Sequence, residues 1–489
     1  MSSTKQPINS IDSDALQLKE LGYSSNFDRS MSFWENFSLG FTYLSPVVGV
    51  YSVFAMALQA GGPAMFWNYF LVGIGQFFVC LVFGEVVSQY PISGGIYPWC
   101  LRLVGTRWAW MSAWVYAWAL FTTVAAVAVG GAPFLSQLLA FESSASTSIW
   151  IAVAMILIST LLNLSGTKLL SKVAMIGFIC ELVGAIVVGG YLLIFSRTQS
   201  IGILFETFEF GSGVDYLPAF IASSVAAMFC YYGFEACGDV AEETPNASTA
   251  IPKSMRMTIY VGGGAATFIC LALLLSVPDL SKAISGEDAD PVTTTLKASL
   301  GEVGYRMVIA IVMISFLSCL LSLQAAASRL LFSFARDGMI LGSNQLSTLS
   351  EATKVPIKAL IVSGLIPIFI ASLGHWLQDA VSTIISFASI GIYIAFQMVV
   401  IGALYARWKG WKPKGSFSLG KWGVFVNVIA LLYGMAAVIN MVWPRMPEEP
   451  WFINFGMLTT SGIVFLTGFI YLMIGKPHTN QKIKHDFTV

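Results

Sequence analysis

The chain has 489 residues, of which 56% are hydrophobic and only 11% are charged, and its 26 Lys and Arg residues balance its 26 Asp and Glu residues. Soluble proteins carry about 25% charged residues, so the composition predicts a polytopic membrane protein. A nucleic-acid-binding protein is excluded, because phosphate contacts require an excess of Lys and Arg. The high hydrophobic content also excludes a disordered chain.

Apolar stretches recur along the chain after the first 35 residues, which are polar and contain no apolar core of a signal peptide. Each stretch is long enough to cross a hydrocarbon layer of about 30 Å as a helix. The sequence therefore predicts an all-α protein with twelve transmembrane helices, over residues 36–59, 64–87, 108–135, 148–164, 173–195, 217–239, 257–277, 303–328, 356–374, 380–405, 424–443 and 452–474.

The Lys and Arg residues predict which side of the membrane each loop faces. If the N-terminus is cytoplasmic, the predicted cytoplasmic segments hold 21 of these 26 residues and the outer segments hold five. Positive residues concentrate in cytoplasmic loops, so we expect both termini in the cytosol, and the plasma membrane as the location. The expected division is an N-terminal tail over residues 1–35, ten helices of a core over 36–406, two further helices over 407–475 and a C-terminal tail over 476–489.

Two of the predicted helices contain helix-breaking residues near their middle. The first contains Pro46 and Gly49, and the sixth contains Gly233 and Gly238. Proline removes a backbone donor, and irregular backbone is tolerated at membrane depth only where it is buried in protein or lines a cavity. Two broken helices at corresponding positions, five helices apart, favour an inverted repeat with a binding site between its halves. Ordinary kinked packing is the alternative interpretation.

The predicted substrate site lies between these two breaks. Half-helix N-termini present free N–H groups to an anionic group, and aromatic rings attract an ammonium group. We expect a substrate carboxylate at the amides of residues 47–49 and an ammonium group near backbone carbonyls and the aromatic residues. The full set of expected contacts is Tyr43, Ser45, Pro46, Val47, Val48, Gly49, Tyr231, Tyr232, Gly233, Phe234 and Glu235.

Several strings accompany this twelve-helix layout: Gly61-Gly-Pro63, Glu85, residues 88–99 (SQYPISGGIYPW), residues 241–246 (AEETPN) with Ile251-Pro252, and residues 328–338 (SRLLFSFARDG). In these features the chain resembles the amino acid–polyamine–organocation superfamily and, within it, the amino acid/choline transporter family, over roughly residues 35–475. The resemblance implies a five-plus-five inverted repeat with two extra helices, and alternating access about a midplane site. Many amino-acid permeases of the superfamily carry Gly-x-Gly in the first helix, whereas this chain has Val47-Val-Gly49, which crowds the approach to the amides.

Charged residues of both signs occur at the predicted cytoplasmic side. We expect a network at an inner gate, and the alternative is a set of solvated or merely structural loop contacts. The residues of this expected network are Glu85, Glu242, Glu243, Arg329 and Arg336.

Glu181 lies midway along the fifth predicted helix, and acidic residues inside membrane helices are costly and by default functional. Proton-coupled relatives in the superfamily often place a Lys at this position, so the resemblance implies a role in ion coupling. We expect Glu181 to carry the coupling proton, to ligate sodium with hydroxyl oxygens of the eighth helix, or to pair with a cationic substrate. A protonated acid with a structural role is the remaining alternative. The hydroxyls in question belong to Ser315, Ser318 and Ser322.

Glu235 and Asp239 both belong to the broken sixth helix. Three interpretations of Glu235 remain open: it caps the inner half-helix, it binds an amine, or it handles a proton.

The sequence thus predicts a secondary active transporter, a symporter that uses an ion gradient to move a small amino acid or an organic amine such as γ-aminobutyrate, choline or a polyamine. A membrane sensor that binds such a solute without moving it is the alternative. An enzyme is not expected, because the three histidines lack metal-ligand spacing and no nucleophile set is recognisable. The expected partners are the solute, a proton or sodium, and membrane lipid, with no cofactor, no metal site and no nucleic acid.

Overall fold

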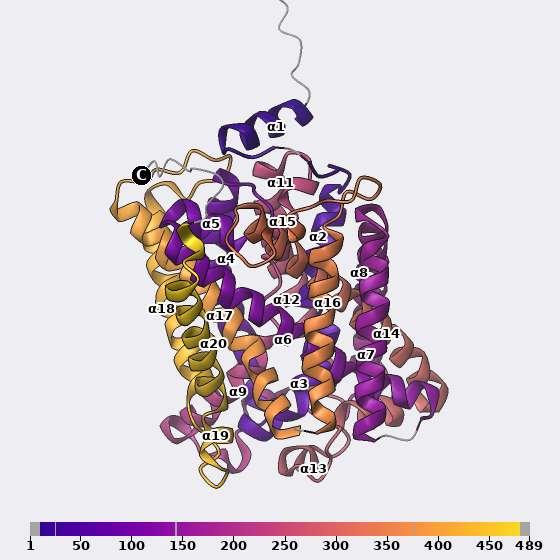
Figure 1. Cartoon of the computed structure of the whole chain (residues 1–489). Coiled ribbons are helices and arrows are strands. Elements are labelled where there is room, and N and C mark those ends of the chain that lie inside the picture. Colours follow the sequence, from indigo (N-terminus) through magenta and orange to yellow (C-terminus); the bar gives the residue numbers. More distant parts are fainter. Residues whose placement is uncertain (1–9, 25, 142–143, 377, 480–489) are drawn as a thin grey trace, which may run out of the picture.

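The computed structural model describes residues 10–24, 26–141, 144–376 and 378–479, and every regular element in these ranges is a helix (Figure 1). Within them, eleven helices are long and apolar enough to cross a membrane. A twelfth span is reached if residues 201–210 and 213–229, which meet at 86°, are counted as one bent pair. The predicted all-α polytopic fold is confirmed.

The membrane-spanning helices follow the predicted order, and the first and sixth are interrupted. Their bounds in chain order are α2 (Phe33–Leu44) with α3 (Pro46–Gly61), α4 (Trp67–Gln89), α6 (Thr106–Leu139), α7 (Ala145–Leu164), α8 (Thr167–Phe195), α9 (Leu217–Phe229) with α10 (Ala236–Asp239), α11 (Ala247–Met257) with α12 (Gly263–Leu274), α14 (Pro291–Arg336), α16 (Ile357–Ser372), α17 (Gln378–Trp408), α18 (Gly423–Val442) and α20 (Gly456–Ile474).

Short helices occupy both ends of the bundle. In Figure 1, α1 and α5 lie at the same end as α11 and α15, and α13 and α19 lie at the opposite end. Their bounds are α1 (Ser10–Glu20), α5 (Ile96–Leu103), α13 (Leu280–Ser285), α15 (Ser343–Leu346) and α19 (Trp451–Asn454).

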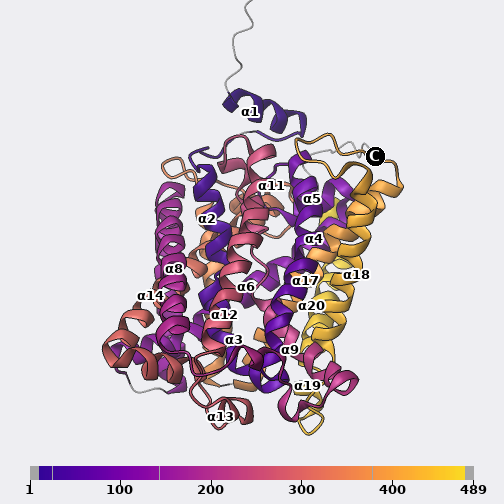
Figure 2. The same ribbon diagram turned by 180° about the vertical axis from the view of Figure 1, so that it is seen from behind.

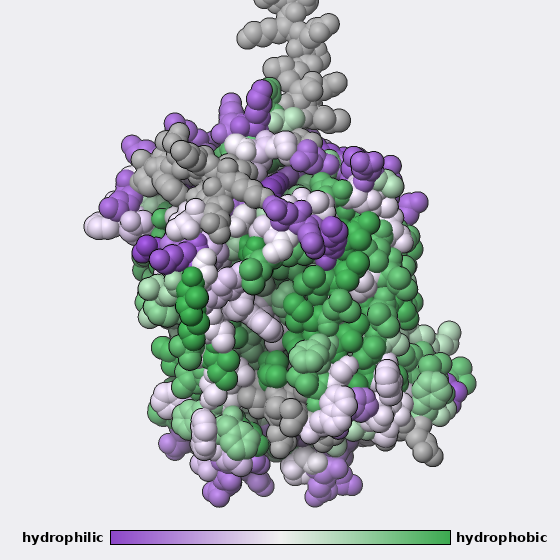
Figure 3. All heavy atoms as spheres, viewed as in Figure 1, coloured by the Kyte–Doolittle hydropathy of each residue, from purple (hydrophilic) through white to green (hydrophobic). Residues whose placement is uncertain are grey.

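The surface carries an apolar band between two polar ends (Figure 3). On α8, for example, the exposed fractions of Ile176, Val183 and Val187 are 56%, 53% and 62%. An apolar surface of this extent is stable only against lipid. The protein is therefore an integral membrane protein.

The helices divide into a buried group and a lipid-facing group. In the most apolar window of the first span 83% of the residues are buried, compared with 28% for α8 and 22% for α20. The view from behind shows α2 and α12 between α8 on one flank and α18 on the other (Figure 2). The first broken helix is thus enclosed by protein, which satisfies the condition for irregular backbone at membrane depth.

Residues Ser10–Glu20 form helix α1, whereas the sequence predicts only a polar tail before the first span. Helix α1 lies across one end of the bundle, the same end at which α20 finishes (Figure 1). Leu18 and Tyr23 are 1% and 4% exposed and form a small apolar cluster with Ile92. These buried side chains explain why a mostly polar segment packs on the bundle.

Candidate functional site

The break in the first span lies at Ser45, between α2 and α3. Ser45 has a φ of +41°, and its N–H closes α2 by donating to the Phe41 carbonyl over 2.7 Å. Pro46 follows as the first residue of α3, where its missing N–H and fixed φ suit a helix start. A new helix N-terminus, with unsatisfied N–H groups, therefore begins inside the first span.

The side chain of Glu181 from α8 occupies this N-terminus. Its Oε1 accepts hydrogen bonds from the Ser45 hydroxyl and from the Val47 N–H, each over 2.8 Å. The carboxyl group is fully buried, and its Oε2 has no partner among the described residues. A carboxylate is well placed at a helix N-terminus, because it meets N–H donors and the positive end of the helix dipole.

The sequence predicts Gly49 within the first break. In the structure it lies inside α3, one turn beyond that break. Its N–H donates to the Ser45 carbonyl over 2.9 Å, so it is not free for a ligand. A Cβ at Gly49 would lie 2.9 Å from the Cys230 sulfur. The glycine therefore permits a close approach of the second broken helix. The Val48 N–H, in contrast, donates to no acceptor among the described residues.

The break in the sixth span covers the residues between α9 and α10. Gly233 has a φ of +112°, a conformation that L-residues rarely adopt. A Cβ on Gly233 would lie 2.5 Å from the Leu44 nitrogen, so the two breaks pack directly against each other. Gly238 belongs to α10 and lies outside the irregular segment.

Glu235 lies at the start of α10 but does not cap it, because no hydrogen bond joins its side chain to that helix. Its Oε2 accepts the Gly233 N–H over 2.8 Å, and its Oε1 accepts the Tyr116 hydroxyl over 3.3 Å. The same Tyr116 hydroxyl lies 3.2 Å from Asp239 Oδ2. The Glu235 side chain therefore occupies the N-cap position of α10 without making a capping hydrogen bond among the described residues. A second buried acid also lies within reach of Glu235 through Tyr116.

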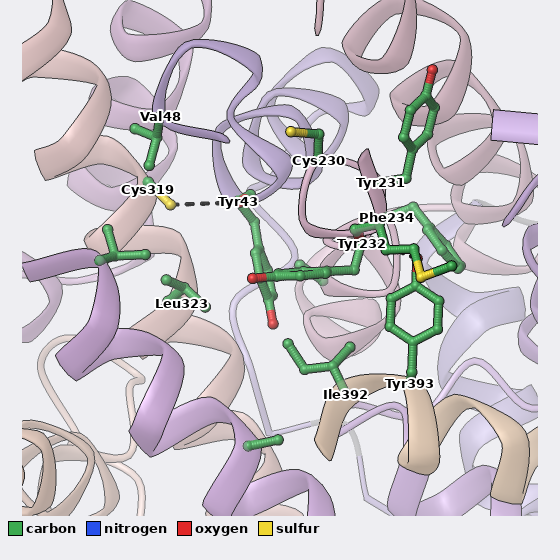
Figure 4. Close-up of a cluster of buried hydrophobic side chains, with 14 of the residues drawn as sticks. Tyr43, Val48, Cys230, Tyr231, Tyr232, Phe234, Cys319, Leu323, Ile392 and Tyr393 are labelled. Atoms are coloured by element: carbon green, nitrogen blue, oxygen red, sulfur yellow. Dashed lines mark hydrogen bonds between the residues drawn. The ribbon is translucent and has the colours of Figure 1, made fainter. Parts of the chain in front are cut away.

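The two adjacent tyrosines of this break point in different directions (Figure 4). The ring of Tyr232 meets the ring of Tyr43 edge-on, with centroids 6.2 Å apart. Tyr231 points away from Tyr43. Its hydroxyl lies 3.3 Å from the Gly263 carbonyl and 3.2 Å from the Thr267 hydroxyl. Phe234 also packs elsewhere, against aromatic rings of other helices. Tyr43 and Tyr232 are thus the aromatic residues at the junction of the two breaks.

The three serines of α14 are all buried, but none of them is a hydrogen-bond partner of Glu181 among the described residues. Ser315 and Ser318 donate to carbonyls of their own helix, those of Ile311 and Ser315. Ser322 shares a 2.8 Å hydrogen bond with the hydroxyl of Thr42 on α2. The structure therefore brings Glu181 to the first break and leaves the serine hydroxyls with partners of their own.

Comparison with known proteins identifies the family of this transmembrane scaffold. The model of the amino acid permease family matches residues 31–470. The chain belongs to this family. It is similar to the amino-acid permease BAT1 of Arabidopsis thaliana, at 26% identity over 94% of each chain, and to a BAT1 homolog of Oryza sativa, at 26% identity over 93% of this chain and 92% of the relative. An uncharacterized amino-acid permease of Schizosaccharomyces pombe is also 26% identical, over 88% of this chain and 80% of its own. The family consists of transporters rather than enzymes, and membership supports amino acid transport.

Two ion pairs with buried acids lie at one end of the permease. Glu243 and Arg329 are fully buried and joined by two hydrogen bonds of 2.8 and 3.1 Å. Glu242 and Arg336 are joined by two bonds of 3.0 Å. These pairs connect the segment after α10 with the end of α14. The structure thus brings together four of the five residues of the predicted gate network.

Glu85, the fifth member, lies apart from these pairs. It forms an ion pair with Arg407 at the end of α17, and its Oε1 also accepts the Leu419 N–H over 2.8 Å. Sequence reasoning did not select Arg407, which is 322 residues away and reads as one of several basic loop residues.

The N-terminal segment adds contacts at the same end of the permease. The Tyr23 hydroxyl donates to Asp337 over 3.0 Å, and the ring of Tyr23 lies 4.1 Å from the Arg336 guanidinium. Asp14 accepts the Asn246 N–H over 2.7 Å and pairs with Arg29. Burial and the neighbouring Asp337 raise the pKa of Tyr23 well above its usual value, so its hydroxyl remains a donor at physiological pH. No sequence pattern indicated these contacts.

Proposed function

We propose that the permease moves a small amino acid together with a proton, by alternating access, and that Glu181 carries the proton. The observation that supports this proposal is the position of the Glu181 carboxyl group on the N-terminus of α3. This is the place where the fold offers N–H donors to an anionic ligand.

The geometry suggests why substrate and proton bind together. In the described structure Glu181 accepts the Val47 N–H, and the neighbouring Val48 N–H is the free donor nearest to it. A substrate carboxylate at Val48 would lie beside a second negative charge in a site from which water is excluded. Protonation of Glu181 removes this repulsion, so the bound proton favours the bound substrate and the substrate favours the proton.

The other end of the substrate fits the aromatic pair. An ammonium group beyond Val48 would meet the rings of Tyr43 and Tyr232, which are buried and lie edge to face. Aromatic faces attract such cations, most strongly away from water. We therefore propose a zwitterionic substrate, an α-amino acid or γ-aminobutyrate, in preference to choline or a polyamine, which lack the carboxylate.

The ion pairs at one end form the inner gate in this proposal. The distribution of Lys and Arg residues supports a cytoplasmic location for this end and for both termini, with the plasma membrane as the membrane concerned. Because Glu243 and Arg329 have no exposed side-chain surface, solute cannot pass them until they separate. In this proposal the described conformation is the one that is closed toward the cytosol.

Substrate accumulation in proteoliposomes tests the role of Glu181. Glu181→Gln keeps an oxygen for Ser45 and Val47 but cannot exchange a proton. We expect proton-driven accumulation to be lost while substrate exchange across equal gradients survives. Glu302→Gln is the matched control, because Glu302 is exposed and forms a surface ion pair with Arg306, one turn along its own helix. It should accumulate substrate like the unmodified protein.

Two other outcomes would contradict the proposal. If Glu181→Gln instead raises the sodium concentration needed for half-maximal uptake, Glu181 ligates sodium. If accumulation, pH dependence and ion dependence all stay unchanged, Glu181 is structural.

Competition by amino acids, choline and polyamines in the same vesicles tests the substrate class. Competition by choline alone would exclude a zwitterionic substrate.

A further inference from the structure

Three buried polar side chains meet just beyond the second break. Glu235, Tyr116 and Asp239 are all 0% exposed. The Tyr116 hydroxyl, from α6, lies 3.3 Å from Glu235 Oε1 and 3.2 Å from Asp239 Oδ2. One tyrosine hydroxyl thus bridges two acids that are four residues apart along the chain.

This arrangement cannot be satisfied if both acids are ionised. A tyrosine hydroxyl has one proton and donates to one acceptor at a time. Two carboxylates that share a buried site also repel each other, and in such pairs one proton is held between them. The cation that acts on Asp239 is Arg329, but its guanidinium already donates to both carboxylate oxygens of Glu243.

An independent observation points to the same site. Tyr43 is 2% exposed, and its hydroxyl faces Glu235, Asp239 and Tyr116. A second tyrosine hydroxyl is therefore buried beside the same two acids and can donate to them. The titratable or charged side chains that face the pair of acids are Tyr43, Cys80, Tyr116, Tyr232, Cys237 and Arg329.

We propose that Glu235, Tyr116 and Asp239 form a second proton-binding site, separate from Glu181, in which Asp239 holds the proton. The protonated Asp239 donates through Oδ2 to the Tyr116 oxygen, and the Tyr116 hydroxyl donates to Glu235. Each donor in this series of hydrogen bonds then has an acceptor, and the pair of acids carries a single negative charge.

The donors around each acid determine which one holds the proton. Glu235 accepts from Tyr116 and also from the Gly233 N–H over 2.8 Å, and two donors stabilise a carboxylate. Asp239 Oδ1 has no partner among the described residues. An unpaired oxygen costs less on a neutral acid than on a carboxylate, so the proton belongs to Asp239.

The loop between α4 and α5 contacts both this site and the gate residue Glu242, whose Oε1 accepts the Ser93 N–H over 3.1 Å. The Asp239 carbonyl accepts the Gly94 N–H over 3.0 Å, and a Cβ on Gly95 would lie 2.4 Å from Asp239 Oδ1. The loop thus covers the acid closely and excludes water from it. When the loop moves, the Asp239 O–H bond can break, with the proton passing to water and the electron pair remaining on the carboxylate.

Infrared difference spectroscopy of the purified protein in lipid tests the assignment, because a protonated carboxyl group has its own C=O band. The Glu181→Gln variant serves as the background, so that Glu181 contributes no such band. At neutral pH we expect a carboxylic-acid band that shifts in D2O and disappears when Asp239→Asn is added. No band in the background variant, or a band that survives Asp239→Asn, would overturn the proposal.

A second variant keeps the test decisive if Asp239→Asn does not fold. Tyr116→Phe removes the oxygen to which Asp239 donates, so the carboxylic-acid band should shift. An unchanged band position would overturn the proposed chain of hydrogen bonds. The assignment does not depend on transport, so the proton site can fail while the proposed function holds, and the reverse.

Discussion

The two breaks in the membrane helices both hold a buried carboxyl group, but they obtain it differently. At the first break Glu181 comes from a neighbouring helix, α8, and binds the Ser45 hydroxyl and the Val47 N–H. At the second break Glu235 belongs to the broken helix itself and binds the N–H of Gly233, two residues away. Glu181 can therefore withdraw without moving the backbone it caps, whereas Glu235 must move with its own segment. The first break suits exchange of a ligand, and the second suits a change coupled to backbone movement.

The largest effect should follow from separating the two breaks. Gly233→Ala places a Cβ 2.5 Å from the Leu44 nitrogen and forces alanine to a φ of +112°. We expect a loss of about 2–5 kcal/mol in stability, measured as a lower melting temperature in detergent. Gly264→Ala is the control, because its Cβ meets nothing within 4 Å. Equal melting temperatures for the two variants would show that the breaks do not depend on this contact.

A smaller effect should come from the hydroxyl donor at the first break. Ser45→Ala removes one of two donors to Glu181, and a hydrogen bond to a charged group contributes about 1.5–3 kcal/mol. Because the ionised form of Glu181 loses a hydrogen bond that stabilises it, the pH of half-maximal uptake should rise by about one to two pH units.

The control for Ser45→Ala removes a hydroxyl at the lipid-facing surface. Thr467→Ala on α20 loses two hydrogen bonds within its own helix, so its uptake profile should match that of the unmodified protein. If the pH of half-maximal uptake is also unchanged in Ser45→Ala, Glu181 is not the group whose protonation controls uptake.

The smallest effect should distinguish the two tyrosines of the second break. Tyr232→Leu removes the ring that faces Tyr43 and should weaken binding of an ammonium group by about 0.5–2 kcal/mol, or about two- to thirtyfold in Kd. Tyr231→Phe removes a hydroxyl bonded to the Gly263 carbonyl and should leave Kd unchanged. Calorimetric titration of both variants with the substrate measures the difference. A higher Kd in Tyr231→Phe would instead place the substrate on the side of this segment toward which Tyr231 points.

The sequence predicted the features that depend on local composition. Length and apolarity specify the membrane spans, because a helix that faces lipid must be apolar over its whole crossing. Pro46 indicated the first break to within one residue, because a missing N–H and a fixed φ act on the adjacent backbone. Gly233 indicated the second break for a similar local reason, since its backbone adopts a φ of +112°. Gly49 and Gly238 also read as breakers, yet both are helical, because glycine permits a bend without requiring one.

Only the tertiary structure decided which groups meet. Glu181 lies 136 residues from Ser45, and Glu85 lies 322 residues from Arg407. Nothing in either local sequence specifies such partners, because they depend on how whole helices pack. The same packing turns Tyr232 toward Tyr43 and Tyr231 away, although the two are neighbours in sequence. The sequence determined by itself that this protein carries buried acids and broken helices in a membrane. The packing of α8 against α2 and α3 decided which acid the first break received, whereas the second break carries Glu235 in its own sequence.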